Sequence, residues 1–297
     1  MTTVGAFAKK TLKSVILNRS SKWHTIGSRR YRMSRFFDSP VNLSEHHEPW
    51  SNAVYSAALA TRDGTFVDVG VNVGQTLRRL LAMDPDRSYL GFEPQLDCLF
   101  YVQQFLEQNS LRNHTVLPIG LSNEKRVVKL MMRAVKTDQT ASTIQGFRPS
   151  EFYARETYIC VATGDSVVKD IGINDIGIVK IDTEGAELEV VEGFSETLQK
   201  RQPILLFEVL NHYLAATGQP LSDEIIRFRN QRNIRFMSHL QNWGYRVFNI
   251  RPDARIIEIS KFFPPKSPDL RVVNHIAIST SDAENFFKAY AGTVTTT

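Results

Sequence analysis

The stretch TFVDVGVNVGQT, residues Thr65–Thr76, contains the pattern that decides the fold of this chain. It begins as a buried strand of apolar residues, and two glycines, Gly70 and Gly74, follow at its end. Glycine has no Cβ and reaches positive φ cheaply, so such a turn lets backbone approach a ligand closely. A helix is expected to begin near Gln75, and its N-terminus adds free N–H groups. This strand, turn and helix predict a site for a nucleotide-type cofactor.

The spacing of the polar residues in this turn narrows the choice of cofactor. The acid, first glycine, amide and second glycine read D-x-G-x-N-x-G over 68–74. A dinucleotide site requires G-x-G-x-x-G and a phosphate-cradling loop requires G-x-x-x-x-G-K-[ST], and neither pattern is present. The turn resembles the first motif of S-adenosylmethionine-dependent methyltransferases, which implies S-adenosylmethionine as the cofactor. The cofactor-binding residues expected here are Asp68, Gly70, Asn72, Gly74, Gln75 and Thr76.

A second acid, Glu93, follows 25 residues after Asp68, where the apolar strand Tyr89–Phe92 ends. Pro94 comes next and breaks the strand. A carboxylate at the end of the second strand of a βαβ unit accepts hydrogen bonds from ribose hydroxyls. We therefore expect Glu93 to bind the ribose of the cofactor.

The stretch VKIDTEGAELEVVEGF, residues Val179–Phe194, carries the most specific pattern in the chain. A buried strand ends at Asp182, and a turn and a helix follow, so acids near the helix start can also act as plain caps. The string K-I-D-x-E-G-A-E-x-x-V-x-x-G resembles the signature of the FkbM family of methyltransferases. Thr183 stands where that family often has an aliphatic residue, which is a mild departure.

The resemblance to the FkbM family covers about residues 55–280, with the motifs in the expected order. VATGDSVV, near Asp165, resembles the segment that leads into the strand before Asp182. LPIGLSN, residues Leu117–Asn123, resembles the strand and polar turn that lie near the adenine in such enzymes. The resemblance therefore implies that Ser122 and Asn123 contribute to cofactor binding.

The order of predicted strands and helices indicates an α/β fold. Strands alternate with helices, which favours a mainly parallel sheet with helices on both faces. The resemblance implies a Rossmann-like class I methyltransferase fold, with a doubly wound, mostly parallel, seven-stranded sheet. Its last two strands, about 245–250 and 273–279, would form an antiparallel edge hairpin. We expect a basic N-terminal arm over 1–50, the methyltransferase domain over 51–285 and a C-terminal tail over 286–297.

Acidic residues at the ends of the predicted strands are the candidates for catalysis and for binding a metal ion. In a doubly wound sheet the site lies beyond the carboxyl ends of the strands, so Asp182, Glu184 and Glu208 should converge there. They can serve as a general base or as ligands of a hard divalent cation. His212 is a second candidate base, since the usual pKa of histidine lies near neutrality. We prefer Asp182 as the residue that activates the acceptor.

The acceptor can be restricted by what the sequence lacks. No N-P-P-Y or D-P-P-Y string follows Asp182, which argues against methylation of a nucleobase amine. No basic stripe with interleaved aromatics occurs beyond the N-terminal arm, so no nucleic-acid partner is expected. We expect O-methylation of a saccharide or a natural-product small molecule. The polar segment 131–157, with Phe152 and Tyr153, is either a lid that stacks on this acceptor or a plug at the rim of the core.

Charge is concentrated at the N-terminus. Residues 1–37 hold nine Lys and Arg and no acid, which gives this segment a charge of +9. Because the net charge of the whole chain is +5, the remaining residues have a net charge of −4. The arm fits a solvated basic helix with an amphipathic stripe, or peripheral contact with an anionic membrane. Two cysteines far apart in sequence form no disulfide framework. We expect a cytoplasmic protein, at the inner face of the membrane if the arm binds lipid; the oligomeric state stays open.

Two other functions are left open by the sequence. An NAD-dependent oxidoreductase or epimerase would also use Glu93 and a glycine turn, but it would have the middle glycine. A non-catalytic scaffold with a cofactor fold would tolerate loss of the acids, yet Asp68, Glu93 and Asp182 are all present. Both alternatives are therefore weaker than a methyltransferase.

Overall fold

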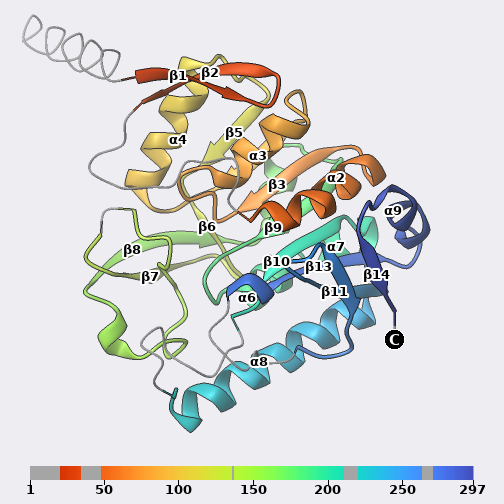
Figure 1. The fold of residues 1–297 in the computed structure, drawn as a ribbon. Helices are drawn as coiled ribbons and strands as arrows, with labels where there is room; N and C mark the ends of the chain where they lie inside the picture. The colour runs from red at the N-terminus through yellow and green to blue at the C-terminus, as the bar shows by residue number, and fades with distance from the viewer. Residues whose placement is uncertain (1–20, 35–47, 136, 211–219, 263–269, 297) are drawn as a thin grey trace, which may run out of the picture.

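The computed structural model describes residues 21–34, 48–135, 137–210, 220–262 and 270–296 of the chain. In this described part, nine strands form one central sheet in the order β14-β12-β11-β13-β10-β9-β3-β4-β5 (Figure 1). The strands are β3 (Thr65–Val69), β4 (Tyr89–Phe92), β5 (His114–Leu117), β9 (Ile176–Ile181), β10 (Ile204–Glu208), β11 (Tyr245–Ile250), β12 (Arg255–Glu258), β13 (Asn274–Ser279) and β14 (Thr293–Thr295).

The half of the sheet from β5 to β10 is parallel throughout. Parallel strands are buried on both faces and therefore read as continuous apolar runs. In β3, Phe66 packs into the core on one face, while Val67 and Val69 pack into the core on the other. Because the strands are parallel, their carboxyl ends meet at one edge, where the polar residues of the predicted site follow them.

The other half of the sheet is antiparallel and larger than the sequence predicted. β13 pairs antiparallel with both β10 and β11, so the two late strands do form the expected antiparallel edge. The seven-stranded sheet is a wrong count, because β12 and β14 extend it beyond β11. These added strands have only four and three residues, and patterns so short do not distinguish a strand from a loop. β14 belongs to the segment 286–297 that the sequence set apart as a tail.

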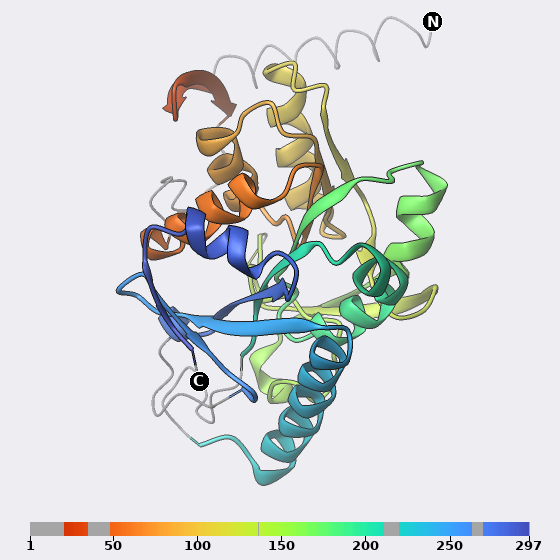
Figure 2. The same cartoon turned by 90° about the vertical axis from the view of Figure 1, so that its right-hand side faces the viewer.

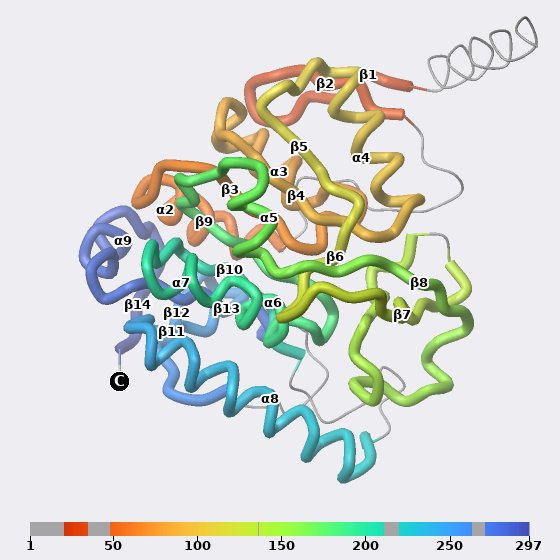
Figure 3. The backbone as a smooth tube through the Cα atoms, turned by 180° about the vertical axis from the view of Figure 1, so that it is seen from behind, coloured from red at the N-terminus to blue at the C-terminus, as the bar shows by residue number. Residues whose placement is uncertain are grey.

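Helices cover both faces of the central sheet (Figures 1 and 3). On one face lie α2 (Asn52–Thr61), α3 (Gln75–Met83), α4 (Leu96–Gln108) and α9 (Ala283–Ala289). On the other face lie α5 (Gly164–Asp170), α6 (Glu187–Gly193), α7 (Ser195–Arg201) and α8 (Asp223–Asn242). The predicted doubly wound, mostly parallel α/β sheet is thus confirmed. Within the described residues, no helix combines the length and the apolar character needed to cross a bilayer.

Two smaller sheets flank the central one. β6 (Gly120–Leu121), β8 (Arg155–Ala162) and β7 (Arg126–Met132) form a three-stranded sheet that projects to one side (Figure 3). β1 (Ser21–Ile26) and β2 (Arg29–Ser34) form a hairpin that packs on α4, on the far side from α8 (Figure 2). The side chain of Asn109 accepts from the N–H of Arg32 and donates to its carbonyl oxygen, which anchors the hairpin. The hairpin lies within the expected arm 1–50, and residues 1–20, with the expected amphipathic helix, lie outside the described residues.

Candidate active site

A cavity of about 560 Å³ lies at the carboxyl ends of the parallel strands. This is the crevice in which doubly wound sheets bind their ligands. It falls within the usual size of small-molecule and cofactor sites, about 300–1,000 Å³. The predicted residues that line it are Gly70, Asn72, Gln75, Thr76, Glu93, Asp182, Glu184 and Glu208.

The turn after β3 is shaped by Gly70 and Asn72. Gly70 has φ of 88°, and a Cβ there would lie 1.9 Å from the carbonyl oxygen of Asp182. Only glycine therefore fits where this turn meets the chain that leaves β9. Asn72 has φ of 50°, and its side-chain oxygen accepts a 2.8 Å hydrogen bond from the Val73 N–H. Asparagine tolerates this left-handed conformation, which explains an amide where dinucleotide sites have glycine.

Glu93 is buried at the end of β4 and is held by backbone donors. One carboxylate oxygen accepts a 2.7 Å hydrogen bond from the Asn72 N–H and the other a 2.7 Å bond from the Gln95 N–H. Burial raises the pKa of Glu93 to about 7, although these two hydrogen bonds oppose the shift. The carboxylate is therefore fixed in place at the cavity before any ligand binds.

Lys180 lies between two acidic side chains, Asp182 in the cavity wall and Asp68 below the cavity. Its ammonium nitrogen lies 3.0 Å from an oxygen of Asp182 and 3.8 Å from an oxygen of Asp68. Asp68 is fully buried and accepts a 2.6 Å hydrogen bond from the Tyr89 hydroxyl; burial raises the pKa of Asp68 to about 6. Burial alone would lower the pKa of Lys180, but the carboxylates of Asp182 and Asp68 raise it above its ordinary value. Lys180 therefore stays charged and ties the floor of the cavity to Asp182.

Asp182, Glu184 and Glu208 form a cluster of three carboxylates, as the sequence predicted. One oxygen from each lies within 4.8 Å of the others. Glu184 pairs with the guanidinium of Arg148, while Glu208 has no hydrogen-bonded side-chain partner among the described residues. Burial, and then the nearby carboxylates of Asp182 and Glu184, raise the pKa of Glu208 well above its usual range. Glu208 is therefore harder to ionise than an ordinary glutamate.

The oxygen atoms of the acidic cluster are suitable ligands for a hard cation, but two of its carboxylates already pair with basic side chains. Three carboxylate oxygens at this spacing are ligands that Mg²⁺ or Ca²⁺ would accept. However, Lys180 already pairs with Asp182 and Arg148 with Glu184, so two of the three carboxylates have cationic partners. A nearby fourth acid, Glu187, accepts from the N–H groups of Thr183 and Gly185 and acts as a helix cap.

Other predicted residues do not line the cavity. Asp68 lies below it, and Gly74 is the N-cap residue of α3, with φ of 82°. Ser122 is buried and Asn123 donates to Glu192 of α6, and neither is among the residues that line the cavity. His212 lies outside the described residues. The expected roles of these residues stay predictions.

The polar segment 131–157 does reach the cavity, but not with its aromatic residues. Asp138–Ala141 line the cavity, and the Gln95 side chain donates a 2.8 Å hydrogen bond to the Asp138 carbonyl. Phe152 lies outside the cavity, with the guanidinium carbons of Arg133 and Arg148 at 5.7 and 5.0 Å from its ring centre. Contact between the acceptor and Phe152 or Tyr153 thus has no support from this arrangement.

Several cavity residues were missed by sequence reasoning because they belong to no local motif. They come from the segment before α2, from α2 and α3, from the turn after β4 and from the antiparallel edge, which are distant in sequence. Lys180 alone stood in a recognised pattern, since it is the first residue of K-I-D. The missed residues include Glu48, Trp50, Tyr55, Arg79, Gln95, Lys180, Arg271 and Asn274.

The Methyltransferase FkbM domain matches residues 68–247, which is more than half of the chain. This range begins at Asp68 and includes Glu93, Asp182 and Glu208. No curated protein sequence matches the chain.

Solved structures similar to this chain include several methyltransferases. The methyltransferase FkbM of Methylobacillus flagellatus KT is 16% identical with a TM-score of 0.42, over 72% of this chain and 43% of that protein. The chain therefore spans less than half the length of that protein. A precorrin-6y C5,15-methyltransferase of Geobacter metallireducens is 13% identical with a TM-score of 0.39, over 77% and 86% of the two chains. An Aeropyrum pernix fibrillarin bound to S-adenosyl-L-methionine is 9% identical with a TM-score of 0.41, over 87% and 82%.

Proposed function

We propose, on the premise that this chain belongs to the FkbM methyltransferase family, that it methylates a hydroxyl group of a saccharide or small natural product. The methyl donor in this proposal is S-adenosylmethionine. The observation that carries the proposal is the meeting of three features at one cavity. These are the turn at Gly70, the prearranged carboxylate of Glu93 and the acid Asp182.

The charge of the cavity favours this donor over a dinucleotide. Six carboxylic acids and three basic side chains are among the lining residues, so acids outnumber bases. A sulfonium cation is attracted to such a site, whereas the pyrophosphate of a dinucleotide is repelled. Glu93 would hold the ribose, and Gln75 and Thr76 at the start of α3 line the same space. When bound, S-adenosylmethionine supplies an electrophilic methyl group on sulfur.

Asp182 is the residue that we assign to proton removal from the acceptor. A hydroxyl is a weak nucleophile until a base takes its proton. The Asp182 side chain is 38% exposed, so an acceptor can reach it, and the Lys180 ammonium at 3.0 Å holds it in place. With the methyl donor bound, Asp182 would take the proton of the acceptor hydroxyl as that oxygen accepts the methyl group. Glu208, whose carboxyl oxygen lies within 4.8 Å of an oxygen of Asp182, would help to orient the acceptor hydroxyl.

The test is a calorimetric titration of the chain with S-adenosylhomocysteine and, separately, with NAD⁺. We expect micromolar binding of S-adenosylhomocysteine alone, and its loss in Glu93→Ala. The exposed Arg112→Met variant, a surface change away from the cavity, is the matched control and should bind as the wild type does. Binding of NAD⁺ in place of S-adenosylhomocysteine would move the oxidoreductase to first place, and binding of neither would favour the scaffold.

A divalent cation at Asp182, Glu184 and Glu208 is a second possibility that the spacing of their oxygens supports. With a cation bound, Lys180 and Arg148 would have to release their carboxylates. Methyl transfer that stops after chelation and returns with Mg²⁺ would establish this role. Transfer that is unaffected by a chelator would leave Asp182 to act without metal.

Contact with an anionic membrane is our proposal for the basic N-terminal region. Within its described part, Lys22, Trp23 and Arg30 are exposed on the β1–β2 hairpin, and the Arg30 guanidinium lies 5.5 Å from the Trp23 ring centre. Basic and tryptophan side chains together suit a lipid interface. Equal flotation with acidic liposomes before and after deletion of residues 1–20 and Trp23→Ala substitution would exclude this contact.

A further inference from the structure

A row of polar side chains in the cavity begins at Asp182 and continues beyond the groups that the proposed reaction uses. An oxygen of Glu208 lies within 4.8 Å of an oxygen of Asp182. Asn274 and Glu48 line the same cavity, and the side-chain nitrogen of Asn274 donates a 2.8 Å hydrogen bond to a carboxylate oxygen of Glu48. The pair of Asn274 and Glu48 is therefore available for a further role in binding the acceptor.

The topology of the central sheet places these groups in this order. Asp182 directly follows β9, Glu208 ends β10 and Asn274 begins β13, and these three strands are neighbours (Figure 1). Glu208 and Asn274 are opposite each other in the antiparallel pair of β10 and β13, so their Cβ atoms are about 4.5–5.5 Å apart. The row therefore runs along the edge of the sheet, away from the cofactor turn that follows β3.

Glu48 is held at the end of this row by its own backbone. Its carbonyl oxygen accepts a 3.0 Å hydrogen bond from the Ser51 N–H and a 2.8 Å bond from the Ser51 hydroxyl. Glu48 has φ of 54°, a left-handed conformation that is uncommon for residues other than glycine and asparagine. Such conformations persist only where the surrounding structure fixes them. The Glu48 carboxylate and the Asn274 amide are thus arranged before an acceptor binds.

The chemistry of the pair suits a neutral hydroxyl group. A carboxylate offers only hydrogen-bond acceptors and an amide offers both donors and acceptors, so the pair matches a group that can donate and accept. A protonated amine offers donors alone and would make no use of the amide N–H groups. Trp50, two residues after Glu48, also lines the cavity and supplies the aromatic surface that often covers the apolar part of a ligand.

The position of the pair beside Asp182 and Glu208 indicates which hydroxyl it binds. Hydroxyl groups on neighbouring ring carbons lie within hydrogen-bond distance of each other, so one can reach Asp182 while the next reaches Asn274. On the premise of the proposed function, we propose that Asn274 and Glu48 bind a second hydroxyl group beside the one that is methylated. The acceptor is then a vicinal diol, as in a pyranose ring. An alcohol with one hydroxyl group would leave the pair without its ligand and is a poor acceptor.

The experiment measures kcat/KM for methyl transfer from labelled S-adenosylmethionine to the methyl glycosides of glucose, galactose, mannose, fucose and rhamnose. The comparison acceptors are the derivatives of each glycoside in which one hydroxyl group has been removed. For a glycoside that is methylated, removal of the hydroxyl next to the reacting one should lower kcat/KM by about ten- to a hundredfold. Removal of a hydroxyl on the far side of the ring should change it little.

Asn274→Leu is the matched protein variant, because leucine is similar in size to asparagine and has no polar group. It should lower kcat/KM for the intact glycoside by about ten- to a hundredfold and remove the difference between this glycoside and its neighbouring deoxy derivative. Its affinity for S-adenosylhomocysteine should equal that of the wild type, which shows that the variant is folded. Asn113→Leu changes an exposed asparagine outside the cavity and should keep the wild-type kcat/KM.

The outcomes separate this inference from the proposed function. Equal kcat/KM for intact and deoxy glycosides would overturn the diol subsite and leave methyl transfer to a hydroxyl in place. Methylation of cyclohexanol as efficiently as of the glycosides would do the same, and so would a protein that binds S-adenosylhomocysteine but methylates none of the glycosides. Failure to bind S-adenosylhomocysteine would instead overturn the proposed function itself.

Discussion

Glu93 follows β4 and Glu208 ends β10, two strands of the same sheet, yet the protein treats their carboxylates in opposite ways. Two backbone N–H groups hold Glu93. Glu208 instead faces two other carboxylates and has no hydrogen-bonded side-chain partner among the described residues. The pKa of both is raised by burial, to about 7 for Glu93 and well above the usual range for Glu208.

This difference separates binding from chemistry within one cavity. The carboxylate of Glu93 is oriented in advance, so a ligand that it recognises loses little further freedom on binding. Glu208 and Asp182 belong to a cluster of carboxyl groups that repel one another when ionised. Binding of a proton or of an acceptor therefore changes the electrostatic free energy of this cluster. Gly70 is the point of contact between the two regions, because it lies against the Asp182 carbonyl.

The largest expected effect is on the rate of methyl transfer, and it comes from a substitution in the cluster of Asp182, Glu184 and Glu208. Asp182→Asn should lower kcat by about 10²–10⁴-fold, because the amide cannot accept the acceptor proton. Its affinity for S-adenosylhomocysteine should stay within about threefold of the wild type, since a single uncharged replacement keeps the shape of the site. Single-turnover kinetics and calorimetry measure the two quantities separately.

Glu93→Gln is the matched change on the binding side. It should weaken cofactor affinity by about ten- to a hundredfold and leave the single-turnover rate of the saturated enzyme nearly unchanged. If both variants lost affinity and rate in the same proportion, the division of roles between the two regions would be wrong.

The next prediction concerns the close contact between the Gly70 turn and the Asp182 carbonyl. Gly70→Ala should lower the free energy of unfolding by about 2–4 kcal/mol, because its Cβ would overlap the Asp182 carbonyl in addition to straining a positive φ. Gly146 also has positive φ, of 75°, but a Cβ there would meet no atom within 4 Å. Gly146→Ala should therefore cost about 1 kcal/mol, from backbone strain alone. Urea unfolding of the two variants measures the difference, and equal losses would show that close packing at Gly70 is unimportant.

The smallest expected effect is the dependence of stability on pH. A carboxyl group with a raised pKa in the folded protein contributes fully below its unfolded pKa, and this contribution is lost as pH rises through the folded value. The gap in unfolding free energy between Glu208→Gln and the wild type should therefore grow in favour of the variant as pH rises above the ordinary glutamate pKa.

Denaturant unfolding at several pH values tests this sign. The Glu208→Gln difference isolates one group, since the other titrating residues are common to both proteins. A gap that shrinks with rising pH would mean that Glu208 is ionised and stabilised in the folded protein, and that it is itself a candidate base.

Much of the site was predictable because it follows strand ends in sequence. The turn from Gly70 to Gly74, Glu93 after β4 and Asp182 after β9 are all local signals, and the parallel sheet brings them to one edge. Ser122 and Asn123 were expected only from the family resemblance of their turn, which follows β6 of the smaller sheet and contacts Glu192 of α6. A local pattern identifies a turn without showing which side of the sheet the turn reaches.

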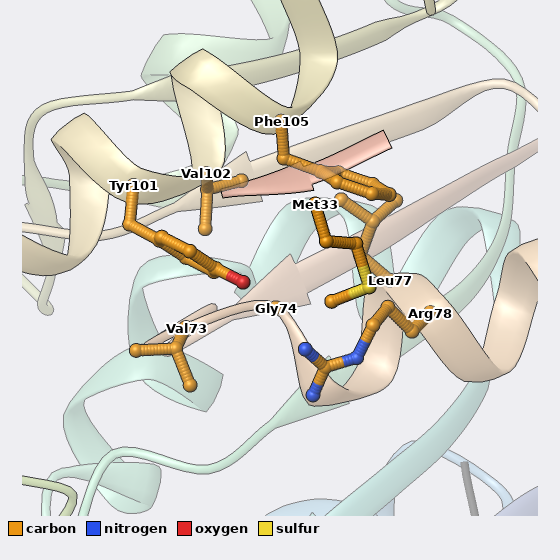
Figure 4. Close-up of a pocket in the computed structure, with 8 residues that line it drawn as sticks. All are labelled: Met33, Val73, Gly74, Leu77, Arg78, Tyr101, Val102 and Phe105. Carbon is orange, nitrogen blue, oxygen red and sulfur yellow. The ribbon is translucent and has the colours of Figure 1, made fainter. Parts of the chain in front are cut away.

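The sequence by itself determined the family, the α/β class and the acids at the ends of the parallel strands, because these depend on residue spacing along single segments. Only the tertiary structure decided that Lys180 bridges Asp68 and Asp182, and that β12 and β14 enlarge the sheet. It also buried the Arg78 side chain between α3, α4 and the β1–β2 hairpin (Figure 4). These features depend on which segments pack together, and packing is set by contacts between residues far apart in the chain.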